Sequence, residues 1–307
     1  MGRITQQFAT DGFAIWMKGN QSNYNFDIHI NEWIQPKDKT YIDIGIRLYD
    51  SKQLKECFIY VPYNFSTDEL IDLSLKLANE NIARGIFNAN CLIKSSSNSP
   101  ITEIEYNGRK ENIINLSATQ NKIKKMNNGT LLIIDFTDIV SLLVHEESYI
   151  RFRIPHKTLS TFFKTKKYNY KFQFESPVMT QRYNYVIKLN EVRSLPFEIR
   201  SIFPTSEQTV KKVITTVSVN EEYVVDDSFC YKTRHLETDL YENYVPRSFQ
   251  CTNVIVYQWL VENKEHYNFN IKMDYSAIMP GSFFLYALLF ILFTFIGNIL
   301  WELIFKI

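Results

Sequence analysis

The sequence predicts an α+β fold: a β-rich soluble region of sandwich-like sheets with one clear helix, followed by a single C-terminal transmembrane helix. Many short segments alternate apolar and polar side chains, which is the pattern of a half-buried strand. One C-terminal run is instead apolar on every side and long enough to cross a bilayer. A chain of 307 residues that is 45% hydrophobic and 22% charged can bury a full core, so we do not expect disorder.

The first part of the soluble region is expected to form strands and then the one clear helix. Alternation of side chains predicts strands at 27–34, 40–50 and 56–62. A helix is predicted over residues 66–85, because Ser66 and Glu69 match a capping box and leucines recur at helical spacing.

Turns and a second series of strands follow. Asn107-Gly108 is the strongest short hairpin signal in the chain, and a second turn ending at Gly129 precedes a buried strand. Further strands are predicted at 149–155, 168–174, 182–189, 210–219, 252–261 and 267–276. We expect two β-rich subdomains, 1–155 and 156–277, and a membrane segment, 278–307.

The membrane segment contains 18 residues without a charge, from Phe283 to Leu300. A helix of that length measures roughly 27 Å, close to the ~30 Å of bilayer hydrocarbon. Pro280 and Gly281 come just before it, where a helix start is natural. The alternative is a buried C-terminal core helix, which is rarely apolar all round. We therefore expect a single-pass membrane protein.

A stripe of small and polar residues interrupts this apolar segment. Helical spacing places Ala287, Ile291, Thr294, Asn298 and Glu302 on one face, with Gly297 beside them. Polar groups that face lipid are costly, whereas they stabilise associated helices or line a pore. The stripe is thus a candidate pore lining or oligomer contact. Alternatively, Asn298 and Glu302 simply lie in the far headgroup region.

Most of the protein is expected on the cytoplasmic side of the membrane. No earlier run resembles a signal peptide or a second span, and a helix at the end of the chain inserts after the body has been made. Arg247, Lys264 and Lys272 precede the span, and Lys306 alone follows it. This excess of basic residues before the span favours the same orientation.

The sequence matches no common catalytic motif. GxSxG, Walker phosphate loops, GxGxxG and HExxH are all absent, and the five histidines lack metal-ligand spacing. Cys230 and His235 lie five residues apart, but a core thiol beside a surface histidine explains them more simply. We therefore expect a non-enzymatic protein with no cofactor and no metal. A membrane-bound hydrolase is the remaining catalytic alternative.

Charge is segregated in the middle of the chain, where no acidic residue occurs between Glu147 and Glu175. Basic side chains neutralise phosphates and aromatic rings stack on bases, so this aromatic-rich stretch is a candidate site for a nucleotide, an oligonucleotide or anionic lipid. Its basic residues are Arg151, Arg153, Lys157, Lys164, Lys166, Lys167 and Lys171. The alternatives are a solvated basic strand pair, or pairing with the acidic stretch between Glu221 and Glu242. The net charge of +1 argues against binding of duplex DNA.

The chain places the terminal sequence YALLFILFTFIGNILWEL (286–303) behind a β-rich region without a catalytic signature. It resembles the membrane effectors of prokaryotic antiphage defence systems, and among them the channel-type effectors of Hailong systems. The likeness is architectural and shares no motif, so no binding residue is carried over. It implies a homo-oligomeric channel, governed by a nucleotide or oligonucleotide signal, that depolarises the infected cell. The alternative is a tail-anchored binding or scaffold protein with a passive tether.

Overall fold

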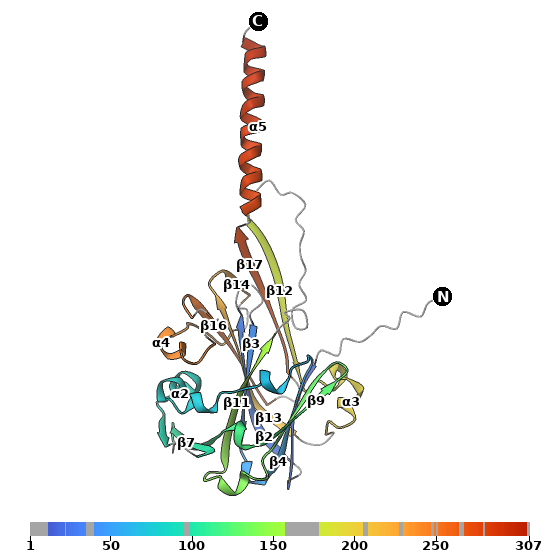
Figure 1. The fold of residues 1–307 in the computed structure, drawn as a ribbon, viewed down its shortest axis with the longest axis vertical. Coiled ribbons are helices and arrows are strands. Elements are labelled where there is room, and N and C mark those ends of the chain that lie inside the picture. Colours follow the sequence, from blue (N-terminus) through green and yellow to red (C-terminus); the bar gives the residue numbers. More distant parts are fainter. Residues whose placement is uncertain are drawn as a thin grey trace, which may run out of the picture.

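The computed structural model describes residues 12–21, 23–34, 40–94, 99–156, 178–204, 208–226, 230–246, 249, 251–263, 267–278 and 280–305. These residues form a β-rich body from which one long helix projects (Figure 1). The predicted class, a β-rich α+β region followed by one apolar C-terminal helix, is confirmed.

A seven-stranded sheet forms one layer of the body. Its order is β14 (Tyr223–Val225), β17 (Tyr267–Ile278), β12 (Val178–Leu189), β1 (Gly12–Gly19), β4 (Leu54–Val61), β10 (Gly129–Asp135) and β9 (Gln120–Met126). The short helix α3 (Phe197–Arg200) covers part of its outer face, where the rings of Trp16 and Phe58 stack with centroids 5.0 Å apart. The edge strand β9 carries Lys122, Lys124 and Lys125, and such charges oppose edge-to-edge pairing with other chains.

A ten-stranded sheet forms the second layer. Its order is β15 (Lys232–His235), β16 (Val254–Glu262), β13 (Gln208–Asn220), β2 (Tyr24–Ile34), β3 (Thr40–Leu48), β11 (Glu147–His156), β8 (Arg109–Ile114), β7 (Ile101–Tyr106) and β6 (Leu92–Lys94), and β5 (Ile71–Asp72) pairs with β11. Its outer face packs against α1 (Ser74–Leu77), α2 (Glu80–Phe87) and α4 (Thr238–Tyr241).

The main hydrophobic core lies between the two sheets. Alternation along β2 decides which side chains enter it: Ile28 and Ile30 are buried in this core. Asp27 and His29, which alternate with them in sequence, point to the opposite face. The sandwich therefore uses the inner face of the ten-stranded sheet for stability and leaves the centre of its outer face to polar side chains.

The helix predicted over residues 66–85 is wrong in extent, although its start is correct. Ser66 and Glu69 do form the capping box, but around a single 3₁₀ turn, Thr67–Glu69. The chain then becomes β5 and pairs with β11, and the Leu73 amide donates to the Arg151 carbonyl at 3.0 Å. Pairing with a sheet strand thus overrides the local helical periodicity, and helix is confined to α1 and α2.

Both predicted turns are present. Asn107 and Gly108 have φ of 48° and 76°, the two positive values that a type I′ hairpin turn requires between β7 and β8. The second turn joins β9 to β10, with Gly129 opposite Met126.

Both sheets combine strands from the two ends of the sequence. β13 runs parallel to β2 along most of its length, and β1 pairs in parallel with the end of β12. The predicted subdomain boundary near residue 155 therefore does not coincide with a break in either sheet. The strand predicted at 168–174 lies outside the described residues.

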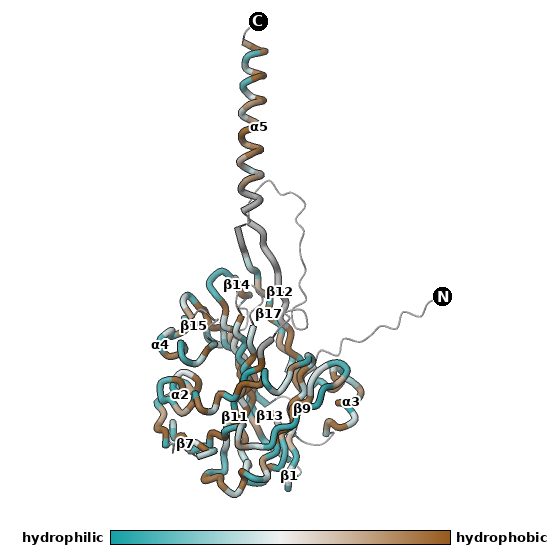
Figure 2. Tube along the Cα trace, viewed as in Figure 1, coloured by the Kyte–Doolittle hydropathy of each residue, from teal (hydrophilic) through white to brown (hydrophobic). Residues whose placement is uncertain are grey.

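The C-terminal helix α5 (Pro280–Phe305) is 26 residues long and follows β17 almost directly. β12 and β17 pair over twelve residues each, and Figure 1 shows this ribbon running from the body to the base of α5. Residues 286–305 form a helix long and apolar enough to cross a membrane, and none of that stretch is buried against the body (Figure 2).

Candidate ligand-binding pocket

A cavity of about 630 Å³ opens on the outer face of the ten-stranded sheet. Six neighbouring strands, from β15 to β11, contribute to its floor, and the end of α2, the β7–β8 turn and Tyr241 of α4 contribute to its walls. Its volume is in the range of small-molecule sites.

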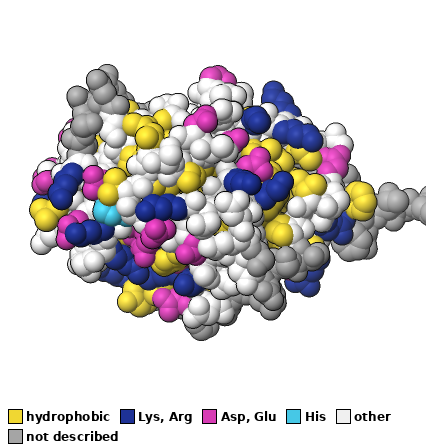
Figure 3. All heavy atoms as spheres, turned by 90° about the horizontal axis from the view of Figure 1, so that it is seen from below, with side chains coloured by type: hydrophobic (Ala, Val, Ile, Leu, Met, Phe, Trp, Pro, Cys, Tyr) yellow, Lys and Arg dark blue, Asp and Glu magenta, His cyan; other side chains and the backbone are white. Residues whose placement is uncertain are grey.

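Basic side chains outnumber acidic ones in the described lining of this cavity. Seven lysines and arginines line it: Arg47, Arg109, Arg151, Lys211, Lys212, Lys232 and Arg234. Two carboxylates, Asp27 and Glu262, oppose them. Six aromatic side chains are interleaved: Trp33, Tyr49, Phe87, Tyr106, Tyr231 and Tyr241. The end of the body remote from α5 instead mixes basic and acidic side chains (Figure 3). The lining therefore suits an anionic ligand that also carries a planar group.

Strand register explains how residues distant in sequence meet on this floor. Lys212 pairs with Asp27, and Asp27 pairs with Arg47. Two residues further along these strands, on the same face of the sheet, His29 and Arg151 are both opposite Gly45. Because side chains two residues apart on a strand share a face, these rows form one continuous polar surface.

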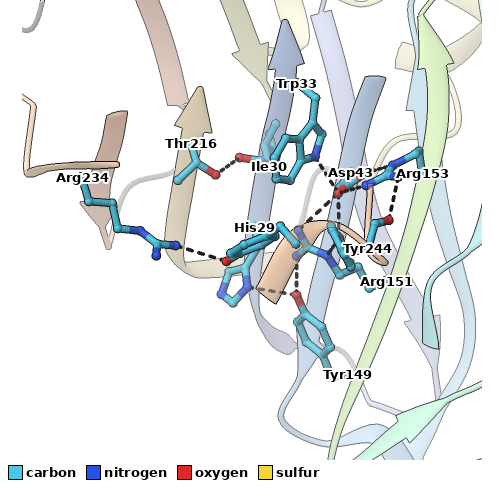
Figure 4. Close-up of polar contacts among 11 residues, drawn as sticks. His29, Ile30, Trp33, Asp43, Tyr149, Arg151, Arg153, Thr216, Arg234 and Tyr244 are labelled. Carbon is cyan, nitrogen blue, oxygen red and sulfur yellow. Dashed lines mark hydrogen bonds and ion pairs between the residues drawn. The ribbon is translucent and has the colours of Figure 1, made fainter. Parts of the chain in front are cut away.

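A buried cluster around Asp43 reaches one end of the floor through Trp33 and Arg151, which line the cavity (Figure 4). Both oxygens of Asp43 accept from Arg153, at 2.5 and 2.9 Å. Trp33 Nε1 and the Tyr244 hydroxyl also donate to Oδ2, at 2.8 and 2.7 Å. Arg151 donates from Nε to the Tyr244 hydroxyl at 2.6 Å, and its Nη2 lies 3.7 Å from the carboxylate. A single chain of hydrogen bonds therefore joins three strands to the α4 region.

The Asp43 cluster holds one carboxylate against two guanidiniums. Burial alone would raise the pKa of Asp43, but Arg153 and Arg151 hold it below its usual value, so this carboxyl is ionised. Burial would likewise lower the pKa of Arg151, but Tyr149, Tyr244 and Asp43 keep it well above its usual range. One positive charge is thus left over in the cluster. Uncompensated buried charge is costly, and an anion in the pocket would offset that cost.

A second cluster, around Arg47, forms the other end of the floor. Arg47 lies 2.8 Å from Glu111 through Nε and 3.3 Å from Asp27 through Nη1. It also donates to the Tyr106 hydroxyl, which in turn donates to Glu111 at 2.6 Å. Arg47 is therefore held rigidly by carboxylates while still lining the cavity.

The structure places the predicted basic residues differently from the expectation. Arg151 and Arg153 do share one face of a strand, but they are 0% and 2% exposed and form ion pairs with Asp43. They are therefore not part of an open basic surface, although Arg151 lines the pocket. The other five predicted residues, Lys157, Lys164, Lys166, Lys167 and Lys171, lie outside the described residues.

Sequence reasoning missed the remaining basic residues of the pocket. These six residues come from strands that are far apart in sequence, so no local charge run marks them: Arg47, Arg109, Lys211, Lys212, Lys232 and Arg234. The available signal was the alternation of Asp27 and His29 with isoleucines along a strand, which places charged groups on one face of a central strand.

The predicted polar stripe lies on one continuous helix, α5. The six residues of the stripe, Ala287, Ile291, Thr294, Gly297, Asn298 and Glu302, are all exposed in the single chain. The Thr294 hydroxyl donates to the Phe290 carbonyl at 2.8 Å, which satisfies it within the helix.

The buried His29 gives stability a defined pH dependence. Burial, with Arg47, Arg151 and Lys212 nearby, lowers the pKa of this imidazole well below 6.5. Below pH 6.5 the unfolded chain takes up a proton on His29 that the folded chain does not, so folding stability falls as the pH falls. We expect His29 to contribute up to ~1.4 kcal/mol per pH unit. Urea unfolding at several pH values should show a shallower pH dependence for His29→Gln, and parallel curves would contradict this assignment.

No protein-family model matches the chain, and a search of curated proteins found no significant match. The pocket and α5 are therefore the two features of the chain that indicate a function.

Proposed function

We propose that this protein is a membrane-anchored, non-enzymatic effector whose body binds an anionic ligand, such as a nucleotide or oligonucleotide, in the basic pocket. The bound ligand controls α5, and copies of α5 associate to form or gate an ion-conducting pore. The observation that carries the proposal is that a short length of chain connects a basic, aromatic-rich cavity to a membrane-length helix. On the architectural resemblance to antiphage effectors, we propose that the outcome is loss of membrane potential in an infected cell.

The path from the pocket to the membrane helix is short and covalent. β16 lines the pocket, and Glu262 at its end and Asn263 just after it also face the cavity. β17 starts at Tyr267 and leads into α5, which starts at Pro280. A shift of β16 on ligand binding would therefore act on the strand that carries α5, with no domain in between.

The pore part of the proposal rests on the α5 stripe. Thr294, Asn298 and Glu302 would face the partner helices rather than lipid, which lowers the cost of their polar groups. Replacement of 286–305 by polyleucine would keep the anchor and remove the stripe. Ion flux lost in this variant supports a pore, whereas unchanged function supports a scaffold on a passive tether.

Anion binding in the pocket is tested by replacing two exposed lysines at its rim. Lys211 and Lys232 line the cavity and are exposed, so their replacement by glutamine should not disturb folding. We expect Lys211→Gln/Lys232→Gln to weaken pyrophosphate binding about 3- to 10-fold, measured by calorimetry on the detergent-solubilised chain.

The matched control is Lys122→Gln/Lys124→Gln. It makes the same change of charge with exposed lysines of β9, in the other sheet. The control should bind pyrophosphate as the wild type does. Equal weakening in both variants would mean that overall charge, rather than the pocket, attracts the anion.

A further inference from the structure

Two side chains face each other across Gly45 at the centre of the pocket floor. His29 on β2 and Arg151 on β11 both pair with Gly45 of β3, which has no side chain between them. The Tyr149 hydroxyl occupies this gap, and a Cβ added at Gly45 would collide with it. His29 and Arg151 are 7% and 0% exposed, so neither is an ordinary surface group.

The hydrogen bonds through Tyr149 assign the proton of His29. Arg151 donates from Nη1 to the Tyr149 oxygen at 2.9 Å, and a guanidinium can only donate. The Tyr149 hydroxyl must then give its own proton to an acceptor, and His29 Nδ1 lies 3.1 Å away (Figure 4). The neutral imidazole therefore carries its proton on Nε2.

Both side chains are left with an N–H group that makes no hydrogen bond to a described residue, although Arg151 Nη2 lies 3.7 Å from Asp43 Oδ2. His29 Nε2 and Arg151 Nη2 are buried and have no hydrogen-bond partner among the residues that the structure describes. Both residues line the pocket. A buried donor without a partner is strongly unfavourable, so such groups are uncommon unless a bound molecule satisfies them.

The same floor offers one acceptor without a donor. Asp27 Oδ2 accepts from Tyr49 at 2.8 Å and pairs with Arg47, but Oδ1 is buried without a partner in the described part of the chain. Asp27 lies two residues from His29 on the same face of β2 and also lines the pocket. Its charge is offset by Arg47, so a nearby anion is not simply repelled.

We propose that His29 Nε2 and Asp27 Oδ1, on one face of β2 and near the buried charge of Arg151, form a seat for the terminal phosphate of a small phosphorylated ligand. One phosphate oxygen accepts from His29, and the P–OH group donates to Asp27. A phosphate monoester has a second pKa of about 6, so it retains a share of P–OH near neutral pH. Sulfate has the same shape but no proton to donate, and an internal phosphodiester also lacks one. The seat thus deepens the proposed function by naming the ligand group that the pocket selects.

The seat is tested by binding of inorganic phosphate and sulfate to the detergent-solubilised full chain, at constant ionic strength and about pH 6.5. We expect wild-type protein to bind phosphate at least about tenfold more tightly than sulfate. His29→Leu removes one donor and should weaken phosphate binding about 10- to 100-fold. Asp27→Asn supplies a donor in place of an acceptor, and should bring the phosphate and sulfate affinities together.

Folding and charge are controlled separately. The thermal unfolding midpoint of each variant shows that it is folded, and Lys122→Gln/Lys124→Gln should keep the wild-type preference for phosphate. Equal phosphate affinity in folded His29→Leu and wild type would overturn the seat. So would a wild type that binds sulfate as well as phosphate, or that binds neither at up to roughly 50 mM.

This measurement can fail independently of the proposed function. It detects ligand binding in detergent and requires no pore. Phosphate binding without any ion flux would keep the seat and reject the pore. Flux that still responds to a phosphorylated ligand in His29→Leu would keep the pore and reject the seat.

Discussion

Asp43→Asn is expected to destabilise the body by about 3–5 kcal/mol, because among the described residues it removes the only carboxylate paired with the buried Arg151 and Arg153. The substitution keeps the shape of the side chain, so the loss isolates the charge. Trp33, one of four tryptophans, donates to Asp43, so its emission is one part of the fluorescence change on substitution. Thermal unfolding of the detergent-solubilised chain should show a midpoint lowered by roughly 10 °C.

Two further variants separate the effect of removing this buried charge from a nonspecific loss of stability. Asp68→Asn makes the same change at an exposed position and should alter stability by less than about 0.5 kcal/mol. Adding Arg153→Met to Asp43→Asn removes a buried cation together with its partner, and should restore part of the lost stability. An unchanged midpoint in Asp43→Asn would show that the cluster does not contribute as the structure indicates.

Ending the chain at Ile278 is expected to move the protein almost completely from the membrane fraction to the soluble fraction. The removed part contains the only membrane-length apolar helix among the described residues. That helix is not buried against the body, so its loss should leave the fold intact. Sedimentation of carbonate-washed membranes measures the distribution.

The polyleucine replacement of 286–305 is the matched control for this truncation. It removes the sequence of α5 but keeps its length and apolar character, so it should remain with the membrane. A truncated chain that still resists carbonate extraction would contradict anchoring by α5.

The strands and the terminal helix were predictable because their signals are local. Alternation in β2, β3 and β13 reflects one face in the apolar core and an opposite face of polar side chains, and the uncharged run in α5 reflects the length of a bilayer. The helix predicted from Ser66 failed because its deciding interaction is not local. β5 forms there only because β11 lies beside it.

The candidate site was much less predictable for the same reason. The run from Arg151 to Lys171 looked like a basic surface, yet Arg151 and Arg153 balance an aspartate more than a hundred positions earlier in the chain. The pocket itself depends on the register of β13, β2 and β3, which places Lys212, Asp27 and Arg47 side by side. No pattern within one segment specifies that register.

The most direct test of the proposed function is ion flux through liposomes that contain the purified full-length protein. The probes are pyrophosphate and a panel of nucleoside triphosphates, with a potential-sensitive dye as readout. We predict that at least one probe raises potassium flux in the wild type. The same probe should act more weakly on Lys211→Gln/Lys232→Gln and have no effect on the polyleucine helix variant. Flux that no probe alters, or that the polyleucine variant retains in full, would contradict the account.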